Sequence, residues 1–63
     1  MSNEKLLKRA WNDYLLAGEP RRYHYQDMFK YYNAVFNTNE TQPTCPSCIA
    51  RVVKRTRLWI EKN

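Results

Sequence analysis

Two cysteines, Cys45 and Cys48, enclose Pro46 and Ser47 in a C-x-x-C sequence. The apolar periodicity after the motif predicts a helix that begins here, and at a helix N-terminus the backbone N–H groups and the dipole lower the pKa of a cysteine. That placement suits redox chemistry. A thioredoxin-like oxidoreductase also needs a βαβ unit, for which 63 residues with helical patterning leave no room. We therefore favour cysteines that pack the start of the helix, with a redox pair as the alternative.

A C-x-x-C is also half of a tetrahedral zinc site. The sequence has no second cysteine pair, and His24 is its single histidine. A complete site needs His24 with an acidic residue, or a second chain that contributes its own pair across a dimer interface. The candidate metal ligands are therefore Cys45, Cys48 and His24, with zinc as the metal, whereas the favoured interpretation has no cofactor.

The carboxylates and potential nucleophiles show no catalytic pattern. Six acidic residues are scattered singly, His24 stands between two tyrosines, and neither H-E-x-x-H nor G-x-S-x-G occurs. No set of nucleophile, base and orienting group can be assembled from them. We predict a protein that binds rather than an enzyme.

Positive charge gathers in residues 49–63. This segment has five basic residues against one acidic residue, a net charge of +4 within the +5 of the whole chain. Such a helix could bind the phosphates of a nucleic acid or the carboxylates of an acidic protein surface, and the ordinary alternative is a solvated helix face. The candidate residues for this contact are Arg51, Lys54, Arg55 and Arg57.

Aromatic residues make up 14% of the chain, which is rich enough either to fill a small core or to reach outward to a partner. Tyr23 and Tyr31 fall off the apolar stripe of their predicted helix, and Leu58 and Trp59 lie within or beside the basic face. These four residues, Tyr23, Tyr31, Leu58 and Trp59, are the candidate partner-binding surface.

Three predicted helices position these residues in one domain that spans residues 1–63. Apolar residues recur at three- and four-residue spacings over 3–17, 22–36 and 46–61. Gly18, the single glycine, marks the end of the first helix, and the turn formers of residues 37–44 predict a loop. The predicted fold class is all-α, a helical hairpin followed by a basic third helix.

The hairpin is expected to bury one apolar stripe from each helix, and the third helix to pack across the pair or onto a partner. The predicted core residues are Trp11, Tyr14, Leu15, Met28, Phe29 and Tyr32 in the hairpin, and Ile49, Val53 and Ile60 in the third helix.

The location of the protein is predicted from what the sequence lacks. No apolar run approaches the roughly 18 residues that cross a bilayer, and residues 1–5 lack the apolar stretch of a secretory signal. Two cysteines are too few for the disulfide framework of a small secreted scaffold. We expect an intracellular protein with no membrane partner.

Residues 31–57 resemble a pattern in short proteins encoded by tailed bacteriophages of gut Bacteroidetes. In that pattern a Y-N-x-x-F-x-T-N-like stretch, here residues 32–39, precedes a C-x-x-C and a basic helix. No established activity attaches to the group, so the resemblance assigns no catalytic residue. It implies a structural accessory of a phage, in the host cytoplasm or the virion, that is stabilised by the assembly it joins.

The leading hypothesis is a non-enzymatic interaction module that docks onto a larger protein assembly, such as a virion component, through its aromatic surface and basic helix. One alternative is a nucleic-acid-binding accessory protein that uses the basic helix. Another is a zinc-clamped or redox protein centred on Cys45 and Cys48. The sequence leaves open whether the chain forms an oligomer.

Overall fold

The structure, a computed structural model, describes residues 2–62 and consists of three α-helices. They are α1 (Asn3–Leu16), α2 (Arg22–Phe36) and α3 (Pro46–Lys62), and residues 2–62 contain no strand. The predicted small all-α fold is confirmed. Two helix ends differ from the predicted ones by a single residue, since α1 ends at Leu16 and α3 continues to Lys62. None of these helices is long and apolar enough to cross a membrane.

The helix ends have local causes in the sequence. Ser2 caps α1, because its Oγ accepts a hydrogen bond from the Lys5 backbone N–H at 3.3 Å. Gly18 follows α1 with a φ of +69°, a left-handed conformation that glycine adopts without a steric penalty. Asn37 ends α2 in the same region, with a φ of +55°. Pro46 is the first residue of α3, where its missing N–H costs nothing.

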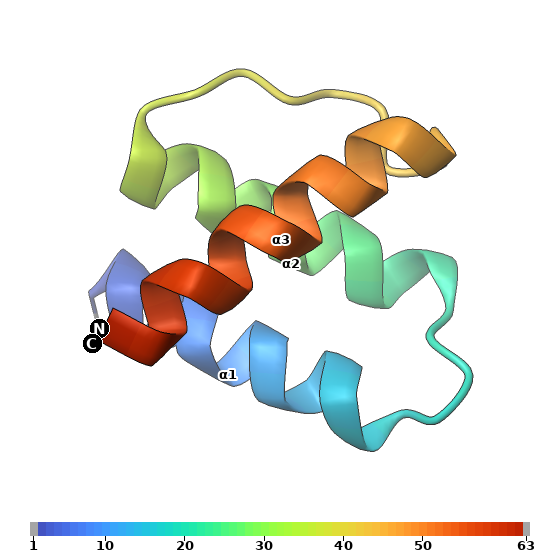
Figure 1. The fold of residues 1–63 in the computed structure, drawn as a ribbon, viewed down its shortest axis with the longest axis horizontal. Helices are drawn as coiled ribbons and strands as arrows, with labels where there is room; N and C mark the ends of the chain where they lie inside the picture. The colour runs from blue at the N-terminus through green and yellow to red at the C-terminus, as the bar shows by residue number, and fades with distance from the viewer. Residues whose placement is uncertain (1, 63) are drawn as a thin grey trace.

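The helices α1 and α2 form an antiparallel hairpin, and α3 crosses the hairpin on one face (Figure 1). The segment between α2 and α3 arches over the molecule and returns the chain to the far end of the hairpin (Figure 1). The last turns of α3 reach the first half of α1, where the Lys8 ammonium lies 5.7 Å from the centre of the Trp59 ring. All three helices therefore contribute to one packed unit.

The core lies where α3 covers the hairpin. Its fully buried side chains come from all three helices, and half-buried apolar residues such as Ile49, Val53 and Ile60 pack around them. This packing confirms the apolar arc that the sequence predicted for the third helix. The buried cluster consists of Leu7, Trp11, Met28, Phe29, Tyr32 and Val52.

One predicted core residue is wrong, because Leu15 is 58% exposed. Leu15 lies in the last turn of α1, and the C-terminal half of α3 covers the other end of that helix (Figure 1). Tyr14, also predicted as core, is half-buried and packs against the rings of Trp11 at 5.4 Å and Tyr25 at 5.8 Å. The periodic stripe of α1 is thus longer than the surface that the other helices cover.

Thr56 is a buried polar residue in an apolar setting. Its side chain is fully buried, and its hydroxyl has no hydrogen-bond partner within residues 2–62. An unsatisfied buried hydroxyl is costly, and valine has nearly the same shape and helix propensity. We expect Thr56→Val to raise the free energy of unfolding by about 1 kcal/mol in denaturation followed by circular dichroism. The exposed Thr41→Val is the matched control, and a destabilised Thr56→Val would show that the hydroxyl is bonded after all.

Candidate partner-binding site

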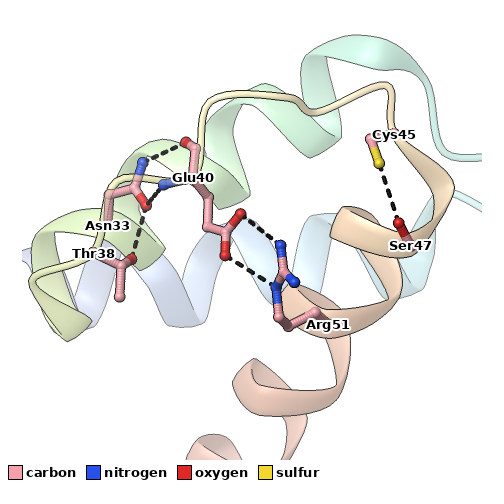
Figure 2. A network of polar contacts seen from close by, with 6 residues as sticks. All are labelled: Asn33, Thr38, Glu40, Cys45, Ser47 and Arg51. Atoms are coloured by element: carbon pink, nitrogen blue, oxygen red, sulfur yellow. Dashed lines mark hydrogen bonds and ion pairs between the residues drawn. The ribbon is translucent and has the colours of Figure 1, made fainter.

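The segment between α2 and α3 is fastened to the end of α2 by one side chain, that of Asn33 (Figure 2). Its Nδ2 donates to the Glu40 carbonyl at 2.8 Å, and its Oδ1 accepts from the Glu40 N–H and the Thr38 hydroxyl, both at 2.9 Å. A single amide thus satisfies three polar groups of a segment that has no secondary structure of its own. The segment between α2 and α3 is therefore held in place by side-chain hydrogen bonds.

Glu40 also joins this segment to α3. Its two carboxylate oxygens accept from Nε and Nη2 of Arg51, each at 3.1 Å, as Figure 2 shows. The hydrogen bonds and charge of Glu40 raise the pKa of Arg51 above its ordinary value. Asn33, Glu40 and Arg51 therefore form a chain of contacts from α2 to α3, which we call the loop clamp.

The predicted basic face of α3 is partly engaged within the molecule. Arg51 belongs to the loop clamp, and the guanidinium of Arg55 lies 5.2 Å from the Phe36 ring centre and 6.0 Å from that of Tyr32. Lys54 and Arg57 are exposed and make no ion pair or hydrogen bond with residues 2–62. All four predicted phosphate-binding residues are thus exposed, and two of them, Arg51 and Arg55, also make contacts within the molecule.

The predicted aromatic surface is divided between two places. Trp59 is half-buried against the core, with its ring 6.2 Å from that of Phe36, while the neighbouring Leu58 is 46% exposed on α3. Tyr23 and Tyr31 lie on α2, where they line two hollows between α1 and α2. The structure thus places Tyr23 in one hollow and Tyr31 in the other, and neither Leu58 nor Trp59 lines them.

The two hollows adjoin, because both are lined by Ala10, Asp13 and Asp27. We call them together the α1–α2 groove. No residue of α3 lines it, and the volumes of its two hollows are about 290 and 230 Å³. The lining residues are Leu6, Arg9, Ala10, Asp13, Leu16 and Ala17 from α1, and Tyr23, His24, Asp27 and Tyr31 from α2.

The groove combines exposed apolar side chains with unpaired carboxylates. Leu16 is 76% and Tyr23 56% exposed, so large apolar groups stand open at one end. Asp13 and Asp27 both line the part that the two hollows share, and neither makes an ion pair within residues 2–62. An apolar rim around negative charge matches a partner segment that carries apolar side chains and a lysine or arginine.

His24 has a structural position in the wall of the groove. Its Nδ1 accepts a hydrogen bond from the Arg21 backbone N–H at 2.9 Å, which satisfies a free donor at the start of α2. Its ring lies 4.1 Å from that of Tyr23. The rings of Tyr23 and His24 therefore pack against each other in the wall of the groove.

The two cysteines lie at the start of α3, as predicted. The Ile49 N–H donates to the Cys45 carbonyl at 2.9 Å, which makes Cys45 the residue that caps the helix. Both thiols are free and half-buried, and Cys48 packs against the core cluster. Within residues 2–62, no group of three or more His, Cys, Asp or Glu side chains is placed to hold a metal ion, so His24 does not join the two cysteines in one chain.

The thiols of the pair differ in acidity. Hydrogen bonds from the Cys48 thiol, the Ser47 hydroxyl and the backbone N–H groups of both residues lower the pKa of Cys45 to about 7. The hydrogen bond to Cys45 raises the pKa of Cys48, and burial and the charge of the Cys45 thiolate raise it further. Cys45 is thus the thiol that ionises first.

Sequence reasoning missed the residues that shape the groove and the clamp. Asp13 and Asp27 belong to the six acidic residues that are scattered singly in the sequence, and neither Leu16 nor Asn33 is among the predicted site residues. The available signal was that Asn33 lies only four residues before the turn formers of residues 37–44. No sequence feature predicts that Asp13 and Asp27 lie in the same groove, because this depends on how α1 and α2 are aligned in the hairpin.

Comparison of the chain with known protein families, with curated proteins and with solved structures found no match.

Proposed function

We propose that the protein is a non-enzymatic interaction module that binds a protein partner in the α1–α2 groove. The observation that carries this proposal is the groove itself, in which exposed Leu16 and Tyr23 flank the unpaired Asp13 and Asp27. The partner is a protein segment that inserts apolar side chains and places a lysine or arginine between the two carboxylates.

A protein segment fits this site better than a small ligand. Both hollows are open to solvent, whereas a small-molecule pocket usually buries most of its ligand. Exposed tyrosine and leucine are residues that anchor protein interfaces, where rings become buried at little cost in conformational entropy. The groove also lies between two formed helices, so its backbone needs little further ordering on binding.

The proposed partner is a subunit of a larger assembly. The resemblance of residues 31–57 to short proteins of tailed phages supports a virion component as that assembly. The small size of the chain supports this too, because a domain of 63 residues gains stability from any partner that binds only its folded form.

Nucleic-acid binding is a weaker proposal because the loop clamp and ring stacking engage Arg51 and Arg55. It would have to rest chiefly on Lys54 and Arg57. Binding of that kind depends steeply on salt, whereas groove binding depends on apolar contacts and two charges.

Affinity capture with matched variants tests the proposal. Tagged protein is expressed in the cells that produce it, and the proteins that co-purify in stoichiometric amounts are quantified with and without nuclease. We expect a partner that co-purifies with the wild type and with Lys54→Ser/Arg57→Ser. The groove variant Leu16→Ser/Tyr23→Ser should lose this partner, and nuclease treatment should not release it. Retention by the groove variant, or loss on nuclease treatment, would overturn the proposal.

A further inference from the structure

The two thiols at the start of α3 lie outside the α1–α2 groove and have no part in the proposed docking. Cys45 caps α3, and Cys48 follows three residues later in the first turn of this helix. Both are free thiols, and both are partly open to solvent. A small reagent can therefore reach the pair.

Local structure holds Cys45 in position. Its backbone N–H donates to the Gln42 carbonyl at 3.2 Å, and the ring of Pro46 fixes the next φ angle. The Cys45 Sγ and Ser47 Oγ lie 3.3 Å apart (Figure 2). These contacts place the sulfur beside the free N–H groups of the helix start, where a thiolate is stabilised.

We propose that Cys45 and Cys48 form a thiol–disulfide exchange site that low-molecular-weight disulfides oxidise, with Cys45 as the attacking thiolate and Cys48 as the resolving thiol. The assignment follows from position. Cys45 caps the helix with its sulfur 3.3 Å from the Ser47 hydroxyl, whereas Cys48 packs against the core cluster.

The exchange has two steps. The Cys45 thiolate attacks one sulfur of the small disulfide, a protein–small-molecule disulfide forms, and the first small thiolate leaves. Cys48 then loses its proton to solvent and attacks the Cys45 sulfur, which forms the Cys45–Cys48 disulfide and expels the second small thiolate. The two electrons removed from the protein thiols reduce one small disulfide to two small thiols.

The intramolecular disulfide should be easily reduced. The start of α3 stabilises the thiolate of Cys45, and a disulfide whose reduced form is stabilised is more oxidising. The pair would switch reversibly rather than serve as a permanent crosslink.

Oxidised glutathione is the probe for the experiment on the full chain. Intact mass spectrometry should show wild type converted to a species lighter by two hydrogens. Cys48→Ser should accumulate one glutathione, and Cys45→Ser should react at least about fivefold more slowly near pH 7 because its remaining thiol is mostly protonated. Circular dichroism checks that each variant keeps its helices.

The pH dependence of alkylation of the wild type needs no variant. The rate should rise with pH around a midpoint near 7, since only the thiolate reacts and the charged groups near the pair are Arg51 and Glu40. Cys48→Ser keeps a hydroxyl donor and should keep a low midpoint, whereas Cys48→Ala should raise it. A wild-type midpoint near 9, equal rates for Cys45→Ser and wild type, or no intramolecular disulfide would each overturn the proposal.

Discussion

Asn33→Ala should lower the free energy of unfolding by about 2 to 3 kcal/mol. The substitution removes three hydrogen bonds to Thr38 and Glu40, each worth about 1 kcal/mol, and the better helix propensity of alanine returns about 0.5 kcal/mol. Loss of the clamp also frees Glu40 from its position beside Arg51. We therefore expect the substitution to accelerate amide hydrogen exchange, relative to the wild type, more in residues 38–45 than in α1.

Two further variants separate the contributions of the individual hydrogen bonds to this loss of stability. Thr38→Val removes one of the three hydrogen bonds and should cost about 1 kcal/mol. Asn33→Asp keeps the acceptors but loses the donor to the Glu40 carbonyl, so it should fall between Thr38→Val and Asn33→Ala. Urea unfolding followed by circular dichroism measures all three. Equal stability of Asn33→Ala and wild type would mean that the clamp does not hold the segment in solution.

Neutralising the groove carboxylates should weaken partner binding by about 100-fold. Asp13→Asn/Asp27→Asn removes both charges at the shared middle of the groove, and each desolvated charge pair is worth about 1.4 kcal/mol or more, a factor of ten in Kd. Calorimetry with the captured partner measures this change. The loss should be larger at low salt than at high salt, because screening weakens the charge contacts of the wild type.

The matched control for this variant is Glu19→Gln/Glu61→Gln. It changes the net charge by the same amount at two exposed residues that do not line the groove. The control should change Kd less than about threefold, since it alters only the long-range field of the protein. Equal losses in the two variants would contradict a partner charge held between Asp13 and Asp27.

The helices were predictable because each has a periodic apolar stripe and a marked end. Ser2, Gly18 and Pro46 mark helix ends through local geometry, which needs no knowledge of the rest of the fold. The exposure of Leu15 was not predictable in this way. A stripe indicates which face of α1 turns inward, but how far α3 covers it depends on the crossing of the helices.

The candidate site was predictable only in part, for the same reason. Tyr23 and Tyr31 were found because they lie off the stripe of α2, and the structure places both in the groove. The engagement of Arg51 with Glu40, eleven residues earlier, and of Arg55 with Phe36 arises from tertiary contacts. The periodicity predicts which charged residues share a helix face, but it does not predict which of them make contacts within the protein.

Site-specific photo-crosslinking tests the central claim most directly. A photoreactive phenylalanine analogue replaces Tyr23 in the groove or, as the control, Leu58 on α3, and both side chains are about half exposed. After irradiation in the producing cells, the crosslinked products are identified by mass spectrometry. The proposed function predicts one dominant protein adduct at position 23, with its crosslinked peptide carrying apolar and basic residues, and little adduct at position 58. Dominant crosslinking at position 58, to protein or to nucleic acid, would contradict it.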